Sequence, residues 1–215
     1  MSTEEMIAEL ASRLRPVRRL PRPGAQAAEW LAMAVAAVVL VLLVTGFRGD
    51  LAAHLSRGFE VAQWVLSVLV GLTAALAAAM LARPDRSWRW GLLPLPFALA
   101  WVASIGWGCL GDMARDGMAG LNPGTSWPCV IFVLLLGVPL TAIQLVLLRH
   151  AGPVRPEPVI ALAGLASAAL CSAGISLFHP TDAAAELLVW HGGAVLVLLG
   201  LGRVFGPALL LRPPR

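Results

Sequence analysis

Ala27–Phe47 reads AAEWLAMAVAAVVLVLLVTGF, a continuous apolar run whose single ionisable residue is Glu29. An α-helix needs about 20 apolar residues to cross the hydrocarbon core of a bilayer. The run is longer than the apolar core of a signal peptide, which is about 7–15 residues, and it follows a polar segment. It therefore predicts a retained membrane-spanning helix.

Five further apolar runs of similar length follow along the chain. They are Val61–Ala82, Gly91–Leu110, Cys129–Leu148, Pro158–Phe178 and Ala184–Gly202. Backbone groups inside a bilayer must bond within the protein, and continuous runs favour helices over the alternating pattern of barrel strands. The sequence thus predicts an all-α polytopic membrane helix bundle with six transmembrane helices. Residues 1–26 would form a cytoplasmic segment, 27–202 the transmembrane domain and 203–215 a cytoplasmic tail.

The composition excludes several classes of function. The 215-residue chain is 59% hydrophobic and 13% charged, and its mean hydropathy is +0.81. Soluble domains are about 45–50% apolar and about 25% charged, so a soluble enzyme, a nucleic-acid-binding domain and a disordered chain are all disfavoured. No CxxC, HExxH or P-loop motif occurs. We therefore predict no enzymatic activity, no cofactor, no metal site and no direct contact with nucleic acid.

The arginines predict the orientation of the spans. Those before the first span, in the second and fourth loops and in the tail share one side: Arg13, Arg15, Arg18, Arg19, Arg22, Arg83, Arg86, Arg89, Arg149, Arg155, Arg203, Arg212 and Arg215. Only Arg48, Arg57 and Arg115 fall on the other side. Cytoplasmic loops of membrane proteins carry the excess of basic residues. Both termini are therefore expected to be cytoplasmic in a protein of the inner membrane.

Residues 2–15 have the pattern of a short amphipathic helix. Ser2 and Glu5 fit a capping box, in which each side chain accepts a hydrogen bond from the other residue's backbone N–H. An apolar stripe recurs at helical spacing and consists of Met6, Ile7, Leu10 and Leu14. Pro16 is expected to end the helix.

Three interpretations of this helix stay open. A helix this short is marginal in water and needs a surface to lie on. It would rest on the anionic inner leaflet with the help of its arginines, or it would present its apolar stripe to a groove on a cytoplasmic protein. The third interpretation is a disordered segment.

The order of several short motifs resembles the NrsF-type anti-sigma factors, the negative regulators of sigma F. The motifs are Ile7-Ala8-Glu9-Leu10-Ala11, Leu14-Arg15-Pro16-Val17-Arg18-Arg19-Leu20, Gly106-Trp107-Gly108-Cys109-Leu110, Ser126-Trp127-Pro128-Cys129, Leu177-Phe178-His179-Pro180 and Val189-Trp190-His191-Gly192. The resemblance covers nearly the whole chain. It implies an inner-membrane protein with six spans whose N-terminal segment binds an extracytoplasmic-function sigma factor. That factor would stay inactive until stress releases it.

Two cysteines are candidates for sensing such stress. Cys109 closes the third predicted span and Cys129 opens the fourth, so both would lie at similar depth on the oxidising side. They would form a disulfide or redox pair, or they would simply pack at helix ends. Cys171 falls inside the fifth span and is expected to pack in the core. Many relatives carry Cys after the His near the end of that span, whereas this chain has Pro180 after His179.

His191 lies about two turns into the sixth predicted span. An ionisable residue at that depth normally faces the bundle and has a partner. It would be a neutral histidine bonded to a neighbouring helix, or a pH- or ligand-responsive element. His54 and Asp112 are expected to be solvated loop residues. A metal site would need Cys109 and Cys129 with Asp112, His179 or Asp182, and no ligand spacing supports one.

The sequence therefore favours a membrane-bound anti-sigma factor that binds its sigma factor through Met6, Ile7, Leu10 and Leu14. Its sensing candidates are Cys109, Cys129 and His191. The alternative is a small membrane thiol oxidoreductase or transporter. The first would be expected to show a closely spaced thiol pair and the second more polar residues along its spans, and neither feature occurs.

Overall fold

The computed structural model describes residues 2–13, 19–122, 124, 127–179 and 184–211, and every regular element within them is helical. Six helical stretches are long and apolar enough to cross a membrane: Pro23–Thr45, Gly58–Leu81, Trp88–Leu121, Cys129–Ala151, Pro156–Ile175 and Ala184–Leu210. They correspond one to one with the six predicted runs. The all-α class and the number of long apolar helices are therefore as predicted.

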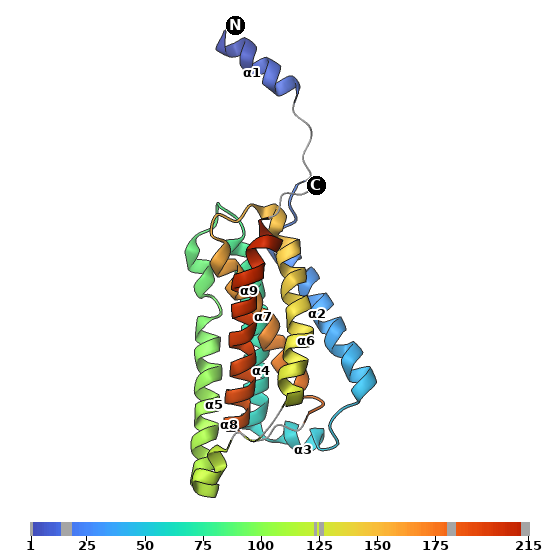
Figure 1. Cartoon of the computed structure of the whole chain (residues 1–215), viewed down its shortest axis with the longest axis vertical. Helices are drawn as coiled ribbons and strands as arrows, with labels where there is room; N and C mark the ends of the chain where they lie inside the picture. Colours follow the sequence, from blue (N-terminus) through green and yellow to red (C-terminus); the bar gives the residue numbers. More distant parts are fainter. Residues whose placement is uncertain (1, 14–18, 123, 125–126, 180–183, 212–215) are drawn as a thin grey trace.

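The elements follow one another in an up-and-down bundle (Figure 1). They are α1 (Thr3–Ser12), α2 (Pro23–Thr45), α3 (Leu51–Ser56), α4 (Gly58–Leu81), η1 (Trp88–Leu92), α5 (Leu95–Asp116), η2 (Gly117–Leu121), α6 (Trp127–Leu148), η3 (Arg149–Ala151), α7 (Pro156–Ile175), α8 (Ala184–Glu186), the π-helical turn η4 (Leu187–His191) and α9 (Gly192–Leu210). The described ends of α2 and α9 nearest the termini lie at the same end of the bundle.

Helix α7 forms the centre of the bundle. It packs against α4, α6 and α9, and 83% of its apolar window is buried inside the protein. Its sequence is rich in Ala, Gly and Ser, whose small side chains let neighbouring helix backbones approach closely. The helix with the smallest side chains is therefore the most deeply buried of the six long helices.

Glycines mark the closest approaches to this central helix. A Cβ built on Gly174 would lie 3.1 Å from both methyl groups of Val38 on α2. One on Gly71 of α4 would lie 2.7 Å from Cγ of Leu170. Gly164 likewise meets Leu199 at 3.3 Å. The missing side chains at these glycines allow α2, α4 and α9 to pack closely against α7.

Contacts between distant segments hold the end of the bundle near the termini. The Arg83 guanidinium donates to the carbonyl oxygen of Pro21 and to Oε1 of Gln26, the latter at 3.1 Å. Trp30 is fully buried and its indole N–H donates to the carbonyl oxygen of Leu140 at 2.8 Å. The arginine-rich loop after α4 therefore packs beside the start of α2, and α2 is tied to α6.

Two helices continue beyond the predicted apolar spans. The third span does not stop at Leu110, because α5 continues to Asp116. The helix of the sixth extends beyond Gly202 to Leu210, which is 1% exposed, so it includes residues 203–210 of the segment predicted as a tail. Arg212 and Arg215 lie outside the described residues. Long apolar runs set where a helix must be, but buried contacts beyond the run extend it.

Candidate functional site

Helix α1 is short and has a well-formed N-terminus. The Ser2 backbone N–H donates to Oε2 of Glu5 at 2.6 Å, and the Glu5 N–H donates to Oγ of Ser2 at 3.2 Å. This reciprocal pair is the predicted capping box. Glu9 and Arg13, four residues apart, form an ion pair at 2.5 Å on the exposed surface. Local interactions alone therefore account for the helix.

The apolar stripe of α1 has nothing packed over it. Met6, Ile7 and Leu10 are 47%, 55% and 62% exposed, and α1 buries none of its residues. In Figure 1 the helix lies beyond the end of the bundle at which α9 also ends. It ends at Ser12, so it is shorter than the predicted 2–15. Leu14, Arg15 and Pro16 lie outside the described residues.

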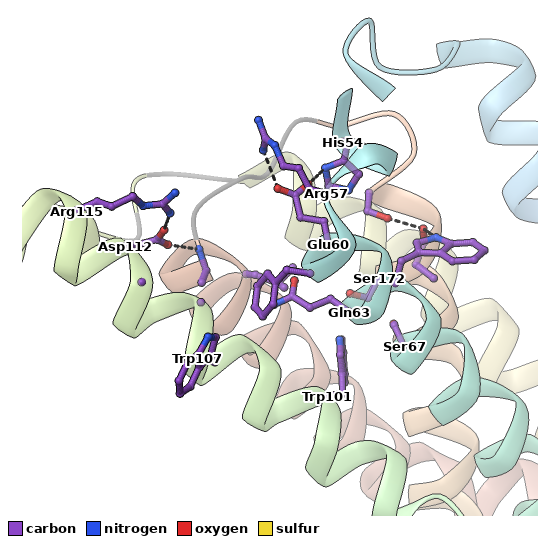
Figure 2. Close-up of a pocket in the computed structure, with 18 residues that line it drawn as sticks. His54, Arg57, Glu60, Gln63, Ser67, Trp101, Trp107, Asp112, Arg115 and Ser172 are labelled. Carbon is purple, nitrogen blue, oxygen red and sulfur yellow. Dashed lines mark hydrogen bonds and ion pairs between the residues drawn. The ribbon is translucent and has the colours of Figure 1, made fainter. Parts of the chain in front are cut away.

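The opposite end of the bundle carries clustered charges (Figure 2). Glu60 at the start of α4 accepts a hydrogen bond from Arg57 at 2.7 Å and contacts Nδ1 of His54 on α3. Asp112 on α5 contacts Arg115 and accepts the backbone N–H of Ala184 at 3.0 Å. Each carboxylate thus joins segments that are distant in sequence or that meet at a turn.

His54 and Asp112 are therefore not the solvated loop residues that the sequence predicted. Both are 9% exposed and both lie within helices. The i,i+3 spacing of Asp112 and Arg115 was visible in the sequence, and it would have indicated helix beyond Leu110. Nothing in the sequence indicated that Asp112 accepts the N–H at the start of α8, because that contact depends on tertiary packing.

The cysteines lie on different parts of the bundle. All three are thiols in the structure. Cys109 is half-buried on α5, which packs against α4 and α8, whereas Cys129 is buried on α6, which packs against α2, α7 and α9. Cys171 is fully buried in the main apolar cluster, the packing role expected for it. The pairing of Cys109 with Cys129 stays a prediction.

His191 faces the centre of the bundle. It ends the π-helical turn η4, is 2% exposed, and its Nδ1 lies 2.6 Å from Oγ of Ser172 on α7. The depth of His191 in the predicted span implied a partner on a neighbouring helix, and Ser172 is that partner. Its other ring nitrogen, Nε2, is buried and has no hydrogen-bond partner among the described residues. A role for His191 in sensing stays a prediction.

A cavity of about 880 Å³ opens between the charged clusters. Helices α3, α4, α5, α7 and α8 and the turn η4 all contribute to its wall. Ser172, the partner of His191, lines it. Sequence reasoning missed this cavity, because its lining comes from segments that no motif links. Within the described residues, no group of three or more His, Cys, Asp and Glu is placed to hold a metal ion.

Six long apolar helices, together with an exposed amphipathic helix at the N-terminus, indicate a polytopic membrane-embedded protein. Residues 10–212 match the family NrsF, described as "Negative regulator of sigma F". The chain is also 30% identical over 179 residues to the anti-sigma-F factor NrsF of Caulobacter vibrioides (strain NA1000 / CB15N), covering 82% of this chain and 83% of that relative. The chain therefore belongs to the NrsF family, whose members are regulatory rather than enzymatic proteins. No solved structure matches it.

Proposed function

We propose that this protein is an inner-membrane anti-sigma factor that holds an extracytoplasmic-function sigma factor through α1 and the residues that follow it. The single observation that carries the proposal is the unpartnered apolar stripe of Met6, Ile7 and Leu10 on a well-capped helix. An amphipathic helix that lays such a stripe in an apolar groove is a common mode of peptide recognition. The family match supports an anti-sigma role.

The orientation follows from the arginines. The basic loops after α4 and α6 lie at the end of the bundle shared with the described ends near both termini, and this end would be cytoplasmic. Helix α1 would then reach soluble sigma factor and hold it at the membrane surface. Leu14, four residues after Leu10, would extend the stripe by one further position.

Release would begin at the other end of the bundle, which would face the periplasm. A signal there shifts the equilibrium only if the two states of the bundle bind the sigma factor with different affinity. Cys109, Cys129 and His191 are the candidates to register that signal. The hydrogen bond between Ser172 and His191 joins α7 to the π-helical turn, so a change at His191 would alter a contact of the central helix.

Double substitution of the stripe tests the assignment. Leu10→Asp with Leu14→Asp is expected to abolish co-purification of the sigma factor, because two carboxylates cannot enter an apolar groove without a large desolvation cost. Membrane insertion, measured by fractionation, should stay unchanged.

A matched control places the same two charges on the other face of α1. Ala8→Asp with Ser12→Asp leaves Met6, Ile7 and Leu10 intact and should retain the sigma factor, since both positions are exposed and lie opposite the stripe. Equal retention by both double variants would reject the stripe as the binding surface.

A further inference from the structure

The cavity at the end of the bundle distant from α1 is walled by aromatic rings. Phe59 and Trp64 from α4 and Trp101 and Trp107 from α5 all line it. Its volume of about 880 Å³ lies in the range of pockets that hold small organic molecules, which is about 300–1,000 Å³. Aromatic side chains favour a flat, conjugated guest that can stack on them or meet their edges.

The charged groups at this cavity already have opposite charges beside them. Glu60 meets Arg57 and His54, and Asp112 meets Arg115. Asp112 also accepts the N–H of Ala184. Because both carboxylates lie against cations, an uncharged guest would enter without breaking an ion pair.

One buried hydrogen-bond donor in the cavity wall lacks an acceptor, and a second donor lies beside it. Nε2 of Gln63 is buried and has no partner among the residues that the structure describes. Figure 2 shows the indole nitrogen of Trp101 pointing toward Gln63, and no hydrogen bond from it is found in the described part of the chain. By contrast, Trp64 and Ser67 in the same wall donate to the carbonyl oxygens of Ala173 and Ala169 at 3.0 and 2.8 Å. A guest that supplied an acceptor oxygen would satisfy the buried Gln63 amide, which is costly to leave unpaired, and could also accept from Trp101.

We propose that this cavity binds an uncharged compound with a flat conjugated ring that bears carbonyl oxygens, of the quinone class. Its ring lies against the indole walls and one carbonyl accepts hydrogen bonds from Gln63 and Trp101. Binding of this compound does not require the sigma factor. A negative result here would therefore leave the anti-sigma function proposed above unaffected.

The test uses the full chain in lipid nanodiscs and ubiquinone-1 as the probe. The ring of ubiquinone-1 is fully substituted, so it does not alkylate the cysteines. Isothermal titration calorimetry is expected to show saturable binding of one probe per chain. Gln63→Leu and Trp101→Phe should each weaken it about tenfold, the effect of losing one hydrogen bond. Naphthalene, which has no carbonyl, and decanoate, which has no ring, should show no saturable binding.

Trp88→Phe is the matched control. It makes the same chemical change as Trp101→Phe on η1, where Trp88 is 56% exposed and outside this cavity, and it should leave binding unchanged. Equal binding by all variants would mean partition into the bilayer, and saturable binding of decanoate would mean a site for anionic amphiphiles. Either result, or no saturable binding of ubiquinone-1, overturns the proposal. If Gln63→Leu loses its helical circular dichroism, Trp101→Phe decides alone.

Discussion

Arg48 and Asp50 lie in the connection between α2 and α3, outside the long apolar helices. The Arg48 guanidinium donates to both carboxylate oxygens of Asp50, at 2.6 and 2.7 Å. The backbone N–H of Arg48 also donates to the carbonyl oxygen of Leu177 at 3.0 Å, which ties this connection to the end of α7. The hydrogen bonds from Arg48 lower the pKa of Asp50 to about 2.

The pair gives a prediction for pH dependence. A lowered pKa means that the pair stabilises the fold above the unfolded value of about 3.9, and that this contribution is lost as the pH falls toward 2. Arg48→Gln should raise the pKa of Asp50 toward about 4. A carbon-13 NMR titration of the Asp50 carboxyl measures this. An unchanged titration in the variant would mean that Arg48 does not hold the carboxylate.

Single residues also show where local sequence is informative. Ser2 and Glu5 lie three apart, and their capping box forms within one helical turn, so it was predictable. His54 is paired with Glu60, which a short helix and a turn bring beside it. That pairing depends on how α3 folds back onto α4, and the sequence does not state it.

Among the helices, α5 differs most from its predicted form. Pro94 immediately precedes α5, after the 3₁₀ turn η1. Proline lacks a backbone N–H, which is no loss at the start of a helix. At its other end, α5 is closed by η2, and Gly120 of that turn packs directly on the backbone of Asp112.

This contact gives a prediction for helix packing. A Cβ on Gly120 would overlap the carbonyl oxygen of Asp112, a backbone atom that cannot rotate away. Gly120→Ala should therefore destabilise the protein by about 1–3 kcal/mol, the usual cost of overpacking. Unfolding in detergent, followed by circular dichroism, measures the change.

Gly111→Ala is the control for that experiment. Gly111 also lies near this end of α5, and a Cβ there would meet nothing within 4 Å. Because alanine is the better helix former, this variant should be as stable as the parent or slightly more so. Equal destabilisation by both substitutions would assign the loss to the helix itself rather than to its contact with η2.

At the scale of the whole molecule, the distribution of arginines over the two ends of the bundle predicts its orientation in the membrane. Alkaline phosphatase is active only in the periplasm. A fusion after Leu121, at the end of η2, should therefore be active, and fusions after Arg86 or Arg215 should be inactive. Green fluorescent protein at the same positions should give the opposite pattern. An active phosphatase fusion after Arg86 would put the basic loops outside and remove α1 from the compartment of its proposed partner.

The six spans, their helical class and the capped N-terminal helix could be read from the sequence. The reason is that the lipid solvent imposes a length and an apolarity on each span separately, and a cap involves only neighbours in the chain. The central position of α7, the contacts of His54 with Glu60 and of Asp112 with Ala184, and the aromatic-lined cavity were decided by tertiary structure alone. They arise from contacts such as those between Gly174 and Val38 or between Asp112 and Ala184, which join residues on separate helices. In a chain where nearly every helix face is apolar, hydrophobicity does not distinguish the buried faces, so the fit of small residues against large ones selects them.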